Sequence, residues 1–357
     1  MITDYNLQIL IEPLLNWFAG HARVLPWREE PTPYRVWVSE IMLQQTRVEA
    51  VKPYFERFTK RLPDVEALAE CPEDELLKLW EGLVYYNRVR NMQKAAIQVM
   101  EAYGGKLPAD YEELLKLKGI GSYTAGAIAS IAYDIPVPAV DGNVLRVFSR
   151  ITEDRQDIMK QSVRRQVEEK LLGIMPKEAP GDFNQALMEL GAVVCVPNGP
   201  ARCMECPVAA LCKAYHHGTV DEFPVKAPKK KRTIENRTVL VIQDGERTAI
   251  HKRPQEGLLA GLYELPNVEG HLSMDEALQK VKEMNLEPLH IETLPEAKHI
   301  FSHIEWRMTG YRIRLSSLEE RKESSFIFTE KKQSEKQYAI PSAFRAYIKY
   351  MKEKPGK

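Results

Sequence analysis

The chain has 357 residues, 44% of them hydrophobic and 28% charged, which suits about two globular domains and excludes a low-complexity chain. Its 50 basic and 50 acidic residues balance, so the net charge predicts no partner for the chain as a whole. No apolar run approaches the roughly 18 residues of a membrane span, and Met1 to Tyr5 do not resemble the start of a signal peptide. We therefore expect a cytoplasmic protein that does not bind membranes.

The first motif along the chain, segment 37–49, has the apolar pattern of one helix start. Ser39 or Glu40 could simply serve the N-terminus of this helix. The adjacent amides Gln44 and Gln45 interrupt an otherwise apolar segment. Because side-chain amides suit hydrogen bonds to base edges, the segment is a candidate nucleic-acid contact.

Three later motifs each have a structural and a functional interpretation. Segment 80–91 combines aromatic residues with arginines, which suits base stacking and phosphate contact but equally suits the end of a core helix. Gly119 and Gly121 lie between two helical patterns and predict a tight turn. That turn is either an ordinary connection or a helix–hairpin–helix element that grips a DNA backbone. Asp141 could cap the following helix or hold a carboxylate at the mouth of a cleft.

A dense group of cysteines follows, with gaps of seven, two and five residues between Cys195, Cys203, Cys206 and Cys212. In a reducing cytoplasm such a group most often binds zinc or an iron–sulfur cluster. A zinc ribbon usually has two separated Cys-x2-Cys pairs, and this array has one, so the spacing favours one [4Fe–4S] cluster. The remaining cysteine, Cys71, is predicted to be a small buried hydrophobic residue.

The pattern of the chain changes after about residue 217. Residues 218–237 are predicted to form a solvated basic linker, with phosphate contact as a secondary role; its basic residues include Lys226, Lys229, Lys230, Lys231, Arg232 and Arg237. Beyond it, β-branched runs flank Asp244-Gly245, which predicts a hairpin, and 275–284 predict a helix. We expect a mainly α domain over 1–217, the linker, and a smaller α+β domain over 238–357.

Together these segments resemble the adenine DNA glycosylase (MutY) family of the endonuclease III, or helix–hairpin–helix, superfamily. The matching motifs occur in the family's order and cover nearly the whole helical domain. They are Leu25-Pro-Trp-Arg, Val38-Ser-Glu-Ile-Met-Leu-Gln-Gln-Thr, Leu117-Lys-Gly-Ile-Gly-Ser-Tyr-Thr, Val140-Asp-Gly-Asn, Phe183-Asn-Gln-Ala-Leu-Met-Glu-Leu-Gly and the cysteine array. The resemblance implies base excision repair by hydrolysis of the N-glycosidic bond of adenine mispaired with 8-oxoguanine, or with guanine, in double-stranded DNA. It also implies a bacterial-type, nucleoid-associated monomer.

The resemblance implies a role for each catalytic residue. Glu40 would protonate adenine at N7, which requires a pKa raised by an apolar pocket. Asp141 would stay ionised and stabilise the oxocarbenium-like sugar, as the second carboxylate does in glycoside hydrolysis. Tyr123 and Asn143 would supply supporting hydrogen bonds, and Arg28 would line the same pocket.

Other matching residues would bind the DNA after the adenine has left the duplex. The residues that match the family's contacts to the stack, the lesion and the backbone are Gln45, Thr46, Leu83, Tyr85, Gly119 and Gly121. The segment 256–266 resembles a strand of Nudix-like domains, although the nearby helix lacks the glutamates of a Nudix hydrolase. Phe301, Ser302 and His303 match the loop with which the family inspects 8-oxoguanine. The cluster would shape a basic DNA-binding loop that contains Arg202.

Two features depart from the family pattern. The first two cysteines are usually separated by six residues, whereas this chain has seven. Val84 stands where the family carries glycine in a Gly-Leu-Gly-Tyr-Tyr segment. If the backbone there requires a positive φ, valine is expected to strain the lesion site.

Endonuclease III-type enzymes of the same superfamily also cut the DNA strand, using a lysine amine at the position that Tyr123 occupies here. Because tyrosine cannot form a Schiff base, the chain is predicted to be monofunctional, with Lys118 as a source of weak strand cleavage. The alternatives are a bifunctional lyase for oxidised pyrimidines and a non-catalytic, metal-dependent DNA-binding protein; the pair of Glu40 and Asp141 argues against the latter.

Overall fold

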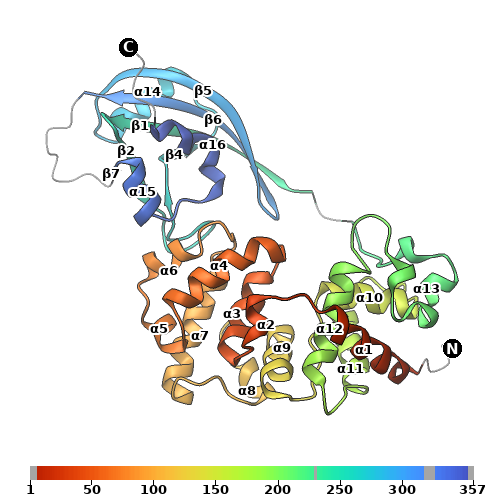
Figure 1. The fold of residues 1–357 in the computed structure, drawn as a ribbon. Helices are drawn as coiled ribbons and strands as arrows, with labels where there is room; N and C mark the ends of the chain where they lie inside the picture. Colours follow the sequence, from red (N-terminus) through yellow and green to blue (C-terminus); the bar gives the residue numbers. More distant parts are fainter. Residues whose placement is uncertain (1–5, 229–230, 317–325, 353–357) are drawn as a thin grey trace. The chain divides into compact units, whose positions relative to one another are not determined.

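The structure, a computed structural model, describes residues 6–228, 231–316 and 326–352 (Figure 1). Met1 to Tyr5, and Lys229 and Lys230 of the predicted linker, lie outside the described residues. By its internal contacts the chain forms two units, Met1–Cys71 with Asn87–Pro228, and Pro72–Tyr86 with Lys229–Lys357. Within the described ranges, no helix is long and apolar enough to cross a membrane.

The first unit is built from helices that pack around apolar side chains. Its α-helices are α1 (Ile11–His21), α2 (Pro26–Glu29), α3 (Pro33–Leu43), α4 (Val48–Arg61), α5 (Val65–Glu70), α7 (Asn87–Tyr103), α8 (Tyr111–Leu115), α9 (Ser122–Tyr133), α10 (Gly142–Thr152), α11 (Gln161–Leu172), α12 (Pro180–Val193) and α13 (Lys213–His216). Short 3-10 helices cover Leu7–Leu10, Cys203–Glu205, Ala209–Leu211 and Val220–Glu222. One core cluster joins α1, α10 and α12 to the cysteine loop. Cys71 is buried, as predicted.

The segment 37–49, predicted as one helix start, contains the second half of α3, a turn and the first two residues of α4. Helix α3 begins earlier, where the Thr32 side chain accepts a hydrogen bond from Arg35 N and Pro33 occupies the first turn. The helix ends at Leu43, and Gln45 has a φ of 60°, in the left-handed region. The prediction was wrong because the apolar pattern continues across a turn that only the backbone conformation reveals.

The glycine turn lies between α8 and α9, as predicted. Gly119 has a φ of 78°, and a Cβ there would lie 2.7 Å from Cβ of Asn91, so a side chain is excluded. Gly121 is the N-cap of α9, which leaves the first N–H groups of that helix at the turn. Helix α9 packs on α3, the helix that carries Glu40.

The second unit is a mixed sheet with helices on both faces (Figure 1). Its strands are β1 (Thr233–Asp244), β2 (Arg247–Lys252), β3 (Tyr263–Glu264), β4 (Asn267–Glu269), β5 (Pro288–Ile300), β6 (Ile304–Leu315) and β7 (Ile327–Thr329), and its α-helices are α6 (Glu73–Leu79), α14 (Met274–Glu283), α15 (Lys331–Gln337) and α16 (Arg345–Ile348). Short 3-10 helices cover Ser342–Phe344 and Lys349–Lys352. The order along the sheet is β3-β2-β1-β6-β5, with β1 and β6 parallel. In addition, β4 pairs with β1 and β7 pairs with β2.

Two core clusters form on this sheet. Ala277 and Val281 of α14 pack against one face, while Phe344 and Tyr347 pack against the other. The predicted helix is α14, whose N-cap Ser273 completes a capping box.

Sequence patterns located the secondary structure of this unit only in part. The predicted hairpin is present, because Asp244 pairs with Arg247 across the turn and Gly245 has a φ of 58°. Strand β1 begins at Thr233, inside the range predicted as linker. Of the segment 256–266, only Tyr263–Glu264 is a strand. The rest turns through positive-φ positions at Gly257, Leu259 and Gly261, which the apolar pattern conceals.

Candidate active site

A cavity of about 920 Å³ opens in the first unit. It is lined by side chains from the region of α2, the end of α3, the glycine turn, the start of α10, and α11 and α12. The predicted site residues among them are Arg28, Glu40, Gln45, Thr46, Gly119, Gly121, Tyr123, Asp141 and Asn143. The structure therefore brings together residues from separate motifs, whereas Leu83, Tyr85, Phe301, Ser302 and His303 belong to the second unit.

Glu40 is a deeply buried acid of this cavity, with 6% of its surface exposed. Its position near the end of α3 turns it toward α9, where the Tyr123 hydroxyl donates a hydrogen bond to Glu40 Oε2. Burial raises the pKa of Glu40 to about 7, although the bond from Tyr123 opposes the rise; the charge of Asp141 raises it further and that of Arg28 lowers it. Glu40 can therefore hold a proton close to neutral pH.

Asp141 combines a structural role with a place in the cavity. It is the N-cap of α10, and Oδ1 accepts a hydrogen bond from Val144 N at 2.7 Å. Asn143 Nδ2 donates to the other oxygen, Oδ2, at 2.8 Å. Burial raises the pKa of Asp141, and these hydrogen bonds oppose the rise because they favour the ionised carboxylate. Asp141 thus accepts two described hydrogen bonds that favour its ionised form, whereas Glu40 accepts one, from Tyr123.

A hydrogen-bonded path leads from this acid to the cysteine loop. Arg146 Nη2 donates to Asn143 Oδ1 at 2.8 Å, and Arg146 Nε donates to the Cys195 carbonyl at 2.9 Å. Arg146 is buried, with 5% of its surface exposed, and its contacts hold the Asn143 side chain on one side and the backbone of Cys195 on the other. Helix α10 therefore connects the cavity to the cysteines.

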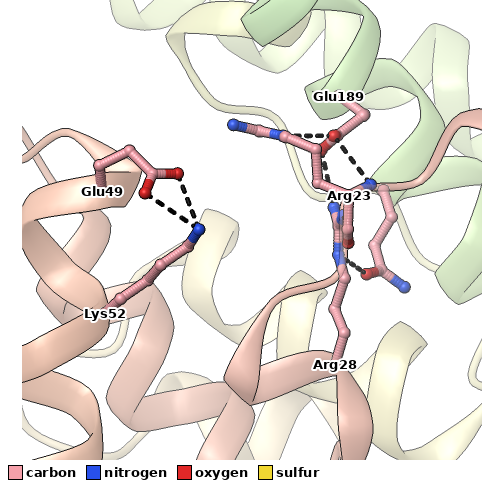
Figure 2. Close-up of polar contacts among 6 residues, drawn as sticks. Arg23, Arg28, Glu49, Lys52 and Glu189 are labelled. Atoms are coloured by element: carbon pink, nitrogen blue, oxygen red, sulfur yellow. Dashed lines mark hydrogen bonds and ion pairs between the residues drawn. The ribbon is translucent and has the colours of Figure 1, made fainter.

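A second cluster on the cavity wall was not anticipated from sequence (Figure 2). Glu189 of α12 is 1% exposed, and its carboxylate receives Arg23 Nε at 2.5 Å and Arg28 Nη2 at 2.9 Å. Burial alone would raise the pKa of Glu189, but the hydrogen bonds and charges of Arg23 and Arg28 outweigh it and the pKa is lowered. The available signal was a charged residue inside the apolar pattern of α12, within a motif already matched to the family.

The four clustered cysteines line one small cavity with apolar neighbours. They are free of disulfides, and Arg150 Nη1 donates to Cys195 Sγ at 3.2 Å. Burial, and then the neighbouring thiols, raise the pKa of Cys206 to about 12 despite an opposing backbone hydrogen bond from Val208. Among the residues that the structure describes, no group of three or more Cys, His, Asp or Glu side chains is placed to hold a metal ion.

The extra residue between the first two cysteines has room. Pro197 to Pro200 are exposed, Gly199 has a φ of 75°, and a Cβ there would have no neighbour within 4 Å. Arg202 is also exposed, with its guanidinium 3.9 Å from Glu205. A longer loop is therefore accommodated in solvent without disturbing the thiols.

The second unit joins two segments predicted to contact the lesion. The Tyr85 hydroxyl lies 3.0 Å from Ser302 Oγ, although 217 positions separate them. Phe301 is edge-on to Trp306, with ring centroids 5.0 Å apart, so it anchors the loop. Ser302 and His303 are exposed beside it, whereas Leu83 is 3% exposed.

Val84, the departure from the family glycine, has a φ of 61°. This is the left-handed region, which a β-branched residue rarely adopts. Its carbonyl accepts a hydrogen bond from Trp80 Nε1 at 3.1 Å, and Tyr85 follows with a φ of 49°. The expected backbone strain at Val84 is therefore present.

Both units match known protein families. The model for HhH-GPD superfamily base excision DNA repair proteins matches residues 38–172, and a NUDIX domain model matches residues 238–350. The chain is 35% identical to the adenine DNA glycosylase of Mus musculus, with 85% of this chain and 70% of that protein covered. It is 33% identical to the adenine DNA glycosylase of Buchnera aphidicola subsp. Schizaphis graminum, with 87% of this chain and 89% of that protein covered. The chain belongs to the adenine DNA glycosylase family.

Two solved structures share the fold of part of this chain. A thermostable thymine-DNA glycosylase has a TM-score of 0.53 and 26% identity, covering 59% of this chain and 96% of that chain. Endonuclease III in a non-covalent DNA complex has a TM-score of 0.52 and 26% identity, covering 61% of this chain and 99% of that chain. The predicted fold class and the predicted activity class, a DNA glycosylase of base excision repair, are confirmed.

Proposed function

We propose that this glycosylase removes adenine mispaired with 8-oxoguanine, or with guanine, from double-stranded DNA. The observation that carries the proposal is the pair of buried acids in one cavity, with Glu40 able to hold a proton near pH 7 and Asp141 hydrogen-bonded as a carboxylate. Two acids in different environments suit two roles at one glycosidic bond. The relatives in Mus musculus and Buchnera aphidicola are adenine DNA glycosylases, which supports adenine as the base released.

In the proposed reaction, Glu40 protonates the flipped adenine at N7, because the neutral base is a poor leaving group. The proton comes from the carboxylic acid, and Tyr123, which donates to Oε2, orients the group. As the bond breaks, positive charge develops on the sugar, and the carboxylate of Asp141 stabilises it with support from Asn143. The resulting Glu40 carboxylate then positions the attacking water and accepts the proton that the water loses as its oxygen bonds to the sugar carbon, which restores the acid.

We propose further that the enzyme is monofunctional. The position that carries the lysine nucleophile in endonuclease III-type enzymes is Tyr123, whose hydroxyl is bound to Glu40. Lys118 is exposed and is not among the residues that line the cavity. The position of Tyr123 therefore offers no amine for a Schiff base, and the lysine that does line the cavity, Lys226, comes from the predicted linker.

We propose that the second unit recognises 8-oxoguanine; it combines the C-terminal domain of the predicted division 1–217, 218–237 and 238–357 with the segment Pro72–Tyr86. The contact between Tyr85 and Ser302 supports this role, since both residues were assigned to lesion contact from separate motifs. On the first unit, Gln45 and Thr46 would enter the stack from the turn after α3, and Gly119 and Gly121 would present N–H groups to a DNA phosphate. His303 would hydrogen-bond to the damaged base.

We propose that Cys195, Cys203, Cys206 and Cys212 hold one [4Fe–4S] cluster. All four thiols face one cavity with apolar walls, and soft thiolates suit iron–sulfur chemistry. When bound, the cluster would act as a structural crosslink of the exposed loop, and catalysis stays with the cavity residues.

The decisive experiment measures release of free base from three duplexes by the iron-loaded protein. We expect adenine release opposite 8-oxoguanine, slower release opposite guanine, and no release of an oxidised pyrimidine. Borohydride treatment should trap no protein–DNA adduct. An adduct with the oxidised pyrimidine would overturn the proposal in favour of a bifunctional lyase, and binding without any release would favour a non-catalytic DNA-binding protein.

A further inference from the structure

The buried cluster around Glu189 has no part in the reaction described above. It consists of one acid, Glu189, and two arginines, Arg23 and Arg28 (Figure 2). All three line the same cavity as Glu40. Two guanidinium groups and one carboxylate leave this wall with one excess positive charge. Buried charges are costly unless they are paired and hydrogen-bonded, so such a cluster must be held by specific contacts.

The contacts around Glu189 are of that kind. Arg23 approaches as a fork, with Nε 2.5 Å from Oε1 and Nη2 3.1 Å from Oε2, and its backbone N lies 3.3 Å from Oε1. Arg28 Nη2 donates to Oε2 at 2.9 Å. Bidentate pairs of this geometry restrict orientation as well as contributing energy. The carboxylate of α12 thus determines where both guanidinium groups lie.

Arg28 is held on its other sides as well. Nε donates to Gln185 Oε1 at 2.9 Å, and Nη1 donates to the Arg23 carbonyl at 3.1 Å. The described contacts use three of the five N–H groups of a guanidinium, so two remain for water or substrate in the cavity. Its positive charge acts on Glu40 together with Tyr123 from α9 and Asp141 from the start of α10.

We propose that Glu189 is a positioning residue for base excision, whose carboxylate clamps Arg23 and Arg28 on the cavity wall and so sets the positive charge that acts on Glu40. The inference rests on the proposed function, because Glu40 is the acid whose proton is transferred. If Glu189 were removed, the two arginines would lose their counter-charge and Arg28 would lose its fixed place. Both effects alter the chemistry at a residue that Glu189 does not touch.

The test follows single-turnover adenine release across pH, where the rate falls on the alkaline side as Glu40 loses its proton. In Glu189→Gln we expect the rate to fall on the order of 100-fold, because a small misplacement near the reacting groups is costly. The alkaline limb of the pH–rate profile, the pH range in which the rate falls, should move to lower pH, because uncompensated arginines favour the ionised form of Glu40. A limb at the wild-type pH would overturn the inference.

Companion variants separate charge from geometry. Glu189→Asp keeps the charge but is too short for both arginines, so the rate should fall while the limb stays in place. If Glu189→Gln does not fold, Arg28→Gln gives the opposite test, because loss of the cation that favours the ionised form of Glu40 should move the limb to higher pH. An unmoved limb there also overturns the inference.

The matched control is Glu49→Gln on α4, which removes an exposed pair with Lys52 at 2.8 Å (Figure 2). Neither rate nor limb should change. A wild type that releases no adenine overturns the proposed function and this inference with it. An active wild type with an unmoved limb in Glu189→Gln overturns this inference alone.

Discussion

The cavity of the first unit and the Tyr85–Ser302 surface of the second unit are built in opposite ways. In the cavity the acids are buried, and Asp141 accepts two described hydrogen bonds. At the surface, Tyr85 is 41% exposed and shares one described hydrogen bond with Ser302, beside the strained backbone of Val84. Proton transfer gains from a low dielectric and fixed geometry, whereas a recognition surface must leave its groups open to a partner.

The strongest test of the cavity is Glu40→Gln. The amide has nearly the same shape but cannot donate the proton, so we expect adenine release to fall by about 10²–10⁴-fold while DNA binding survives. Single-turnover release and a binding titration on the same duplex measure both. Release at the wild-type rate would contradict the assignment of the general acid.

Asp141→Asn separates the two roles of that residue. Asparagine is as good an N-cap as aspartate, so the melting temperature should change little. Without the negative charge, however, release should fall by about 10²–10³-fold, the size of effect typical of lost electrostatic stabilisation. Unchanged release with an intact fold would mean that Asp141 only caps α10.

The pH dependence of release reports on the burial of Glu40. Because burial raises its pKa to about 7, the acid keeps its proton below that pH and loses it above. We expect a constant rate below pH 7 and a fall of about tenfold per pH unit above it, measured at single turnover with binding saturated. A rate that already falls near the ordinary pKa of glutamate would show that the cavity opens to water.

Substitutions at the Tyr85–Ser302 surface should have smaller effects than those in the cavity. Tyr85→Phe removes the hydroxyl bound to Ser302, and the preference for 8-oxoguanine over guanine should fall about fivefold, since one hydrogen bond contributes about 1 kcal/mol. Tyr103→Phe is the matched control, because its hydroxyl bonds to Glu113. An equal loss of this preference in both variants would contradict a role for Tyr85 in lesion recognition.

The smallest expected effect concerns the strained valine. In Val84→Gly the relief of left-handed strain should exceed the entropic cost of glycine and raise the free energy of unfolding by about 1 kcal/mol. Val84→Ala keeps the Cβ and should gain less. Denaturant unfolding measures both, and a less stable glycine variant would show that Val84 contributes through packing.

Local chemistry made much of this protein predictable. The cap at Asp141, the turn at Gly119, the hairpin at Gly245 and the helix after Ser273 depend on side chains a few residues apart. The apolar pattern failed where a turn interrupts it, at Gln45 and in the segment 256–266, because it records burial and not the sign of φ. The strain at Val84 was foreseeable because a family glycine is missing there.

Residue types and spacing were enough to name Glu40, Asp141 and the cysteines as the chemistry-bearing groups. Packing alone decided the pKa of Glu40, which depends on how completely α3, α9 and the start of α10 exclude water. It also created the Glu189 cluster and the contact between Tyr85 and Ser302, whose partners are far apart in sequence. Desolvation and long-range pairing have no local signature, so only the folded chain reveals them.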